Sequence, residues 1–255
     1  MSATDAGTFA AGIRALLFDL DGTLLDTAGD LSHALNELLA REGRAPLDPA
    51  RIRCHVSQGA SALVRLGFPH ATDAEFQALR GGLLAIYRGA LAVHTRPFEG
   101  IPELLDHLER HGMPWGVVTN KPYAFAVPLL EALGLARRAA VIVGGDTLPE
   151  HKPHPRPLLH AAERIGVTPA ETAYVGDARG DMLAARAAGM RAVAACFGYL
   201  QPGENPREWP ADAWIDSPRE ILDWLRSGAP AAPAPTAATP GAPAAPASSV
   251  VATPA

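Results

Sequence analysis

The apolar positions of the chain follow two patterns, and these divide it into two kinds of region. Residues 13–18 form a continuous apolar run, which is typical of a strand buried on both faces of a parallel sheet. Between residues 28 and 95 the apolar positions recur at helical spacing, as Leu31, Leu35 and Leu38 illustrate. We therefore expect a helical block inserted directly after the first strand.

Beyond residue 96, short apolar runs alternate with helical segments. The expected strands are residues 114–119, 139–143, 172–175, 191–195 and 213–215, and the expected helices are residues 101–110, 121–133, 155–165, 178–188 and 218–226. This alternation predicts a parallel, doubly wound α/β sheet. Residues 13–27 and 96–226 then form the core domain, and residues 28–95 form an all-helical cap.

The composition of the two ends of the chain differs from that of an ordered domain. Residues 1–12 are mostly small or polar, and we expect a flexible N-terminus. Residues 227–255 contain seven prolines, twelve alanines and no charged residue. Such a segment cannot bury enough apolar surface to become ordered, so the composition predicts a disordered tail.

Charge and targeting signals exclude several classes of protein. The net charge is only −5 and the basic residues are scattered, which argues against a nucleic-acid partner. No signal peptide or membrane-spanning stretch is recognisable, so we expect a cytoplasmic protein without a membrane partner. The oligomeric state stays open. Cys54 and Cys196 form no disulfide framework, and Lys121 and Lys152 are the only lysines in the chain.

Two acids follow the first expected strand, Asp19 and Asp21, and Gly22 comes directly after them. Ligands of open α/β sheets bind beyond the carboxyl ends of the strands. Two carboxylates this close repel each other unless they share a cation or a proton, and Mg²⁺ suits such ligands. The alternative is an Asp-Gly hairpin turn. A hairpin needs no second acid, and the preceding run is too apolar for a solvated edge.

Three further strand ends carry polar groups. Thr119 and Asn120 follow the second strand, Lys152 lies in a proline-framed loop, and Asp177 and Asp181 stand one helical turn apart. Taken singly, Thr119 and Asp177 are also typical of helix caps, whereas the prolines around Lys152 disfavour a merely solvent-facing lysine. Taken together, they predict a site in which carboxylates bind Mg²⁺ and Lys152 and Thr119 bind a phosphoryl group. One carboxylate remains to attack phosphorus, and a second can transfer a proton.

These segments resemble the four motifs of the haloacid dehalogenase superfamily. They are residues 19–27 (DLDGTLLDT), residues 119–121 (TNK), residues 152–157 (KPHPRP) and residues 176–181 (GDARGD). The resemblance covers roughly residues 13–226. It implies a Rossmann-like core with the type of helical insert called a C1 cap.

The resemblance also implies a role for each motif residue. Asp19 is the expected nucleophile, and Asp21 is the expected general acid and base, whose backbone carbonyl also binds Mg²⁺. Asp177 is a further expected metal ligand, and Asp181 supports the metal or Lys152. The phosphoryl oxygens are expected to be bound by Thr119, Asn120 and Lys152.

Two features narrow the chemistry within the superfamily. Asp21 argues against dehalogenation, because dehalogenases lack this second acid. The absence of any lysine between Asp26 and Lys121 argues against phosphonate hydrolysis, which needs a lysine in the cap. A phosphomonoester hydrolase remains, with β-phosphoglucomutase-like transfer as an alternative. A receiver-like signalling module is a more distant alternative, because its acceptor aspartate lies on a different strand from its acidic pair and it has no cap.

The substrate stays open between two small carboxylate-bearing esters. Residues 176–189 and 197–199 are similar to phosphoglycolate phosphatases, whose substrate is 2-phosphoglycolate. Residues 56–60, 115–122 and 204–209 are similar to the N-acetylmuramic acid 6-phosphate phosphatases of cell-wall recycling.

The cap loop is expected to contribute to substrate binding. Ser57, Gln58 and Gly59 should face the active site, and Ser57 stands where phosphoglycolate phosphatases usually carry a second glycine. Arg65 is a candidate ligand for the substrate carboxylate, and the alternative is a solvated helix arginine.

Overall fold

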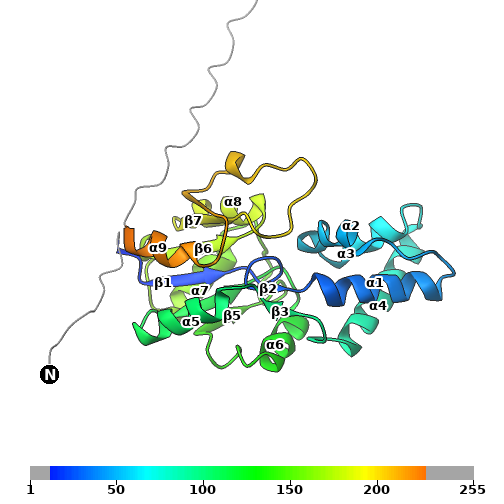
Figure 1. Ribbon diagram of the computed structural model, residues 1–255, viewed down its shortest axis with the longest axis horizontal. Coiled ribbons are helices and arrows are strands. Elements are labelled where there is room, and N and C mark those ends of the chain that lie inside the picture. Colours follow the sequence, from blue (N-terminus) through cyan, green and yellow to red (C-terminus); the bar gives the residue numbers. More distant parts are fainter. Residues whose placement is uncertain (1–11, 228–255) are drawn as a thin grey trace, which may run out of the picture.

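A computed structural model describes residues 12–227, and a six-stranded sheet lies at its centre (Figure 1). The strands are β1 (Ala15–Phe18), β4 (Trp115–Val118), β5 (Val141–Val143), β6 (Thr172–Gly176), β7 (Arg191–Ala195) and β8 (Ala213–Ile215). Their order is β5-β4-β1-β6-β7-β8, and every pairing is parallel. From β1 the chain adds β4 and β5 on one side of this strand and then crosses to β6 on its other side. The strand order therefore reverses at β1, and open α/β sheets bind ligands at such a point. The predicted doubly wound α/β fold is confirmed.

Helices cover both faces of the sheet because successive strand residues point to opposite sides. Leu16 and Phe18 of β1 pack in one apolar cluster, and Leu17 packs in the other. The first cluster is completed by α5 (Ile101–Arg110), α6 (Tyr123–Ala132) and α9 (Glu220–Ser227), and the second by α7 (Arg156–Ile165) and α8 (Arg179–Ala187). These strand side chains are fully buried. Each such burial stabilises the fold by about 2 kcal/mol, which explains the uninterrupted apolar run.

The element boundaries agree with the expected ones to within two residues. The helix at 101–110 and the strands at 191–195 and 213–215 coincide with α5, β7 and β8. The helix expected from residue 121 begins later, at Tyr123, because Pro122 has an extended backbone with ψ of 141°. A proline also disfavours the helical conformation of the residue before it. Lys121 is therefore excluded from the helix, and this placement matters for the site.

The segment between β2 (Leu25–Asp26) and β3 (Arg96–Pro97) is helical and stands to one side of the sheet (Figure 1). It contains α1 (Ala28–Arg41), α2 (Pro49–Arg53), α3 (Gly59–Gly67) and α4 (Asp73–Gly89), with a short 3₁₀ turn at Val56–Gln58. These helices share an apolar cluster of their own. The sequence did not predict the antiparallel pair β2–β3, because two residues on each side give no recognisable periodicity.

A buried carboxylate ties the start of this helical cap to its end. Asp30, in the first turn of α1, is fully buried. Its carboxylate accepts hydrogen bonds from the His94 amide at 2.7 Å, the Thr95 amide at 3.0 Å and the Thr95 hydroxyl at 2.6 Å. Three donors satisfy a charge that would otherwise be unfavourable in the interior. Asp30 therefore fixes the point at which the chain returns to the core.

Two sequence predictions concern chain ends that lie mostly outside the described residues. The flexible N-terminus was expected at 1–12 and the disordered tail at 227–255, and of these the structure describes only residues 12 and 227, the latter as the end of α9. Among residues 12–227, no helix is long and apolar enough to cross a membrane.

We expect Asp30→Ala to lower the free energy of unfolding by about 3 kcal/mol, because it leaves buried donors without an acceptor. Urea denaturation followed by circular dichroism measures this change. Asp73→Ala is the matched control, since the Asp73 side chain is exposed and its loss should have little effect. A similar small effect for both variants would show that Asp30 does not anchor the cap.

Candidate active site

Asp19 lies where β1 ends, at the point where the strand order reverses. Its amide donates a hydrogen bond to the Val175 carbonyl of β6 at 2.9 Å and so extends the pairing of the two strands. The residue is 8% exposed, and its side chain reaches the crevice. One carboxylate oxygen accepts a hydrogen bond from the Leu20 amide at 2.7 Å and lies 3.0 Å from the Lys152 ammonium. Burial raises the pKa of Asp19 to about 6, although Lys152 opposes the shift. The group is therefore buried yet mostly ionised at neutral pH.

Lys152 is a buried cation with three partners. Its ammonium donates to Asp181 Oδ1 at 2.7 Å and to the Tyr174 hydroxyl at 2.6 Å, besides its contact with Asp19. The Tyr174 hydroxyl in turn donates to the Val118 carbonyl at 2.7 Å. Burial alone would lower the pKa of Lys152, but the Asp181 and Asp19 carboxylates raise it. Lys152 therefore carries a fixed positive charge beside the expected nucleophile.

Asn120 holds the loop that carries this lysine. Its amide nitrogen donates to the Lys152 carbonyl, and its amide oxygen accepts from the Lys152 amide, both at 3.0 Å. Thr119 is buried at the end of β4, where its amide donates to Val143 and its hydroxyl accepts from the Lys121 amide at 3.2 Å. Both Asn120 and Thr119 line the cavity described below. The paired contacts of Asn120 favour a role in positioning Lys152.

Asp177 follows β6 and is enclosed by donors. Its carboxylate accepts from the Ser57 hydroxyl at 2.8 Å, the Tyr199 amide at 2.9 Å and the Thr23 hydroxyl at 3.3 Å. Burial, followed by the nearby charges of Asp19 and Asp181, raises the pKa of Asp177 to about 8.

Glycines make this enclosure of Asp177 possible. A Cβ atom at Gly22 would lie 2.0 Å from Asp177 Oδ2, and one at Gly198 would lie 2.2 Å from Asp177 Cβ. No side chain can occupy either position without displacing the carboxylate. Gly22 also has a φ of 84°, which favours glycine independently of the space available.

Three buried acids converge beyond the strand ends. Asp19, Asp177 and Asp181 each offer one carboxylate oxygen, and these atoms lie within 4.8 Å of one another. Burial is the main cause of the raised pKa values of Asp19 and Asp177, and the repulsion between like charges at this separation adds to it. A hard divalent cation takes oxygen ligands and relieves that repulsion. The donor set therefore fits a divalent metal.

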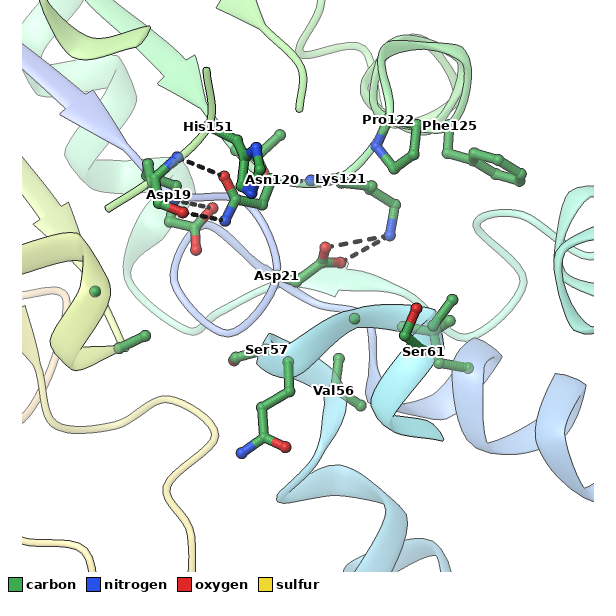
Figure 2. Close-up of a pocket in the computed structure, with 18 of the residues that line it drawn as sticks. Asp19, Asp21, Val56, Ser57, Ser61, Asn120, Lys121, Pro122, Phe125 and His151 are labelled. Atoms are coloured by element: carbon green, nitrogen blue, oxygen red, sulfur yellow. Dashed lines mark hydrogen bonds and ion pairs between the residues drawn. The ribbon is translucent and has the colours of Figure 1, made fainter. Parts of the chain in front are cut away.

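The side chain of Asp21 has different partners, and Figure 2 shows it facing Lys121. The Lys121 ammonium lies 2.9 Å and 3.3 Å from the two carboxylate oxygens, and the Thr27 hydroxyl donates to one of them at 2.6 Å. The ammonium also lies 4.7 Å from the centroid of the Tyr87 ring. Burial would lower the pKa of Lys121, but Asp21 and Tyr87 raise it. Of the atoms of Asp21, only its backbone carbonyl remains as an expected metal ligand.

A cavity of about 440 Å³ separates these strand ends from the cap. Among the predicted site residues, its lining includes Asp19, Asp21, Thr119, Asn120, Lys152 and Asp181 from the core and Ser57, Gln58 and Gly59 from the cap. Ser57 and Val56 face the cavity from the cap side, opposite Asn120 (Figure 2). Asp177 is joined to this lining through its hydrogen bond with Ser57. The structure thus brings the predicted residues of core and cap loop together.

Arg65 is the predicted site residue that the structure places elsewhere. It is not part of the cavity lining, and its side chain is 46% exposed. The guanidinium donates to the Ala71 carbonyl at 2.9 Å, lies 4.2 Å from the Phe76 ring centroid and approaches Asp73 at 3.7 Å. These contacts hold Arg65 against the start of α4. The structure therefore does not bring Arg65 together with the other predicted site residues.

Sequence reasoning missed several lining residues, namely Arg80, Leu84 and Tyr87 of α4 together with Lys121 and His151. The residues from α4 recur at spacings of four and three, so they share one helix face. That signal was available, but it did not reveal which face meets the cavity. Lys121 is expected only as part of the second motif, without a role of its own.

Comparisons with known proteins agree with this site. Residues 16–195 match the family model of the haloacid dehalogenase-like hydrolases, and the chain belongs to this family. A phosphoglycolate phosphatase of Xylella fastidiosa is 46% identical over 205 residues, which cover 80% of this chain and 90% of the relative. An N-acetylmuramic acid 6-phosphate phosphatase of Pseudomonas aeruginosa is 43% identical over 214 residues, which cover 84% and 95%.

Solved structures give the same result. The crystal structure of a predicted phosphoglycolate phosphatase from Haemophilus somnus has a TM-score of 0.76 and is 28% identical. The similarity covers 83% of this chain and 97% of that one. Within its family, the protein is a phosphatase.

The raised pKa values predict how pH and a divalent cation affect stability. In the metal-free protein the folded state holds protons on Asp19 and Asp177 that the unfolded state has already lost. These groups therefore make the free energy of unfolding decrease as pH rises from the ordinary value of 3.8 to about 8. Since a cation binds the deprotonated carboxylates, Mg²⁺ should raise the melting temperature more at about pH 9 than at about pH 6.

Thermal denaturation with and without Mg²⁺ at both pH values measures this difference. Asp177→Asn serves as the comparison, because it removes one buried acid and should abolish most of the Mg²⁺ response. An equal response at the two pH values would contradict the assignment of these acids to the cation site.

Proposed function

We propose that this phosphatase hydrolyses small, carboxylate-bearing phosphate monoesters through an aspartyl-phosphate formed on Asp19, with Mg²⁺ as cofactor. The main supporting observation is the ionised, buried carboxylate of Asp19 beside the charged Lys152, at the floor of a cavity next to the acid cluster. A nucleophile, an anion-binding cation and a proton-transferring acid are the parts that this reaction needs.

In the first step a carboxylate oxygen of Asp19 attacks phosphorus, and the bond from phosphorus to the ester oxygen breaks. Lys152 and the Thr119 hydroxyl bind the phosphoryl oxygens while the geometry at phosphorus inverts. The Lys152 charge is available because Asp181 and Asn120 hold the side chain and its loop in place. Mg²⁺ bound by Asp19, Asp177 and the Asp21 carbonyl, and supported by Asp181, would neutralise phosphoryl charge.

Asp21 is assigned the proton transfers. It lies two residues from Asp19, and its carboxylate lines the cavity on the side of Lys121. It donates a proton to the leaving alkoxide in the first step. In the second step it accepts a proton from the water that attacks the aspartyl-phosphate, which releases inorganic phosphate and restores Asp19. Thr27 and Lys121 hold the side chain of Asp21 in place, and the proton that it takes from water in the second step is the one that it donates to the next leaving group.

The relatives leave two substrates in consideration. Their names give phosphoglycolate and N-acetylmuramic acid 6-phosphate, at 46% and 43% identity to this chain. These identities are too similar to decide between the two, so the cavity must be considered instead. β-Phosphoglucomutase-like transfer is the remaining alternative reaction. It would return the phosphoryl group to a sugar and release little inorganic phosphate.

We expect Asp19→Asn to lower kcat by at least about 10³-fold, because the amide is a very poor nucleophile. Release of inorganic phosphate with Mg²⁺ measures this for 2-phosphoglycolate and N-acetylmuramic acid 6-phosphate. Asp73→Asn, an exposed acid on the cap, should keep the rate of the unmodified protein. Substantial phosphate release by Asp19→Asn would remove Asp19 as the nucleophile.

Asp21→Asn should show a dependence on the leaving group. Alkyl phosphates need a proton on the departing oxygen, whereas p-nitrophenolate leaves without one. We therefore expect a loss of about 10²-fold or more in kcat/KM for an alkyl phosphate and a clearly smaller loss for p-nitrophenyl phosphate. Equal losses for both esters would argue against Asp21 as the general acid.

A further inference from the structure

One face of α4 lines the cavity on the side of the cap. Arg80, Leu84 and Tyr87 belong to the lining, and their spacing places them on a single stripe of the helix. The catalytic groups all come from the core instead. The part of a substrate that is not phosphorylated is therefore expected to meet α4.

Arg80 differs from the other cationic side chains of the cavity. Lys121 is paired with Asp21, and Lys152 is paired with Asp19 and Asp181. Among the described residues that line the cavity, Arg80 is the cation for which the structure records no ion pair or hydrogen bond, and it is half-buried. A planar guanidinium in this setting is suited to bind a carboxylate through two parallel hydrogen bonds.

Tyr87 supplies a second, independent observation. The residue is 1% exposed, and among the described residues its hydroxyl has no partner at hydrogen-bond geometry, although the nearby Lys121 ammonium interacts with it electrostatically. Its ring is stacked against Phe125 at 5.8 Å between centroids, with 19° between the planes, and it also contacts the Lys121 ammonium. Buried hydroxyl groups are normally hydrogen-bonded, because an unpaired one is unfavourable. A fixed ring with an unpaired hydroxyl is thus prepared for a polar group of a ligand.

We propose that Arg80 and Tyr87 form the recognition subsite for the unphosphorylated part of the substrate. Arg80 binds a carboxylate, and the Tyr87 hydroxyl binds a neutral hydrogen-bonding group. This inference rests on the proposed phosphatase reaction and names its substrate class, a phosphorylated sugar acid such as N-acetylmuramic acid 6-phosphate.

The smaller candidate substrate, 2-phosphoglycolate, offers fewer partners to Arg80 and Tyr87. In 2-phosphoglycolate a single methylene joins the carboxylate to the phosphate ester, so no neutral polar group remains for Tyr87. Such a molecule would also leave most of the cavity of about 440 Å³ unfilled. A sugar acid carries hydroxyl, ether and amide groups between its phosphate and its carboxylate. The two α4 side chains therefore favour the sugar acid.

The test measures kcat/KM for four esters. N-acetylmuramic acid 6-phosphate and N-acetylglucosamine 6-phosphate differ by the lactyl carboxylate, and 2-phosphoglycolate and p-nitrophenyl phosphate complete the set. The unmodified protein should prefer the muramic acid ester over the glucosamine ester by at least about tenfold. Arg80→Leu should bring this ratio close to one, mainly through KM, and Arg80→Lys should restore part of it.

Tyr87→Phe removes the hydroxyl and keeps the ring that stacks on Phe125. Its melting temperature should not decrease. Its kcat/KM should fall by about fivefold or more for the two sugar phosphates relative to 2-phosphoglycolate, which is also an alkyl ester but has no neutral group for the hydroxyl. Arg65→Leu is the matched control for Arg80→Leu. It removes an arginine from the same cap that lies outside the cavity lining, and the preference ratio should not change.

The outcomes separate the subsite from the reaction itself. Phosphate release from none of the four esters would overturn the proposed function. Turnover of p-nitrophenyl phosphate with a preference for 2-phosphoglycolate over the muramic acid ester would leave the reaction standing and overturn the subsite. An unchanged preference ratio in folded Arg80→Leu, or no loss on sugar phosphates in Tyr87→Phe, would likewise overturn it.

Discussion

The Lys152 ammonium lies between two buried carboxylates, 3.0 Å from Asp19 and 2.7 Å from Asp181, and the strand ends are arranged around this ion cluster. Buried charges are unfavourable unless each is paired and hydrogen-bonded. The partners here come from three different strand ends, after β1, β5 and β6. Tyr174 and Asn120 add the remaining hydrogen bonds. The register of the parallel sheet is thus what makes a buried lysine possible.

The two lysines of the chain both serve the first motif. Lys152 is paired with Asp19 and Lys121 with Asp21, so each of the two acids has its own cation. Asp177 has no such partner in the described structure, only neutral donors, and its pKa is raised to about 8. The excess of negative charge is electrostatically unfavourable in the unliganded protein. A divalent cation with a phosphoryl group would relieve this repulsion. Active sites often lower the stability of the unliganded protein in this way, because the groups that activity requires are unfavourable without their ligands.

In the proposed mechanism, the core carries out the chemistry and the cap recognises the substrate. The groups assigned to bond making and proton transfer all follow strands, where the sheet holds them rigidly. The cap contributes α4 and the loop at Ser57, which donates a hydrogen bond to Asp177. This contact joins the recognition element directly to the acid cluster. At the base of the cap, Asp26 forms an ion pair with Arg53 of the cap and accepts a hydrogen bond from Tyr199 of the core. Asp26 is therefore a second link between cap and core.

Local patterns in the sequence were sufficient for the sheet, the cap and the acids at the strand ends. An apolar run followed by Asp19, or a helical turn between Asp177 and Asp181, depends only on neighbouring residues. Tertiary structure decided which helix face meets the cavity. It placed Arg65 outside and Arg80 with Tyr87 inside, because the rotation of α3 and α4 is set by packing within the cap. The pairing of Lys121 with Asp21 likewise spans a hundred residues, a distance over which no periodicity carries information.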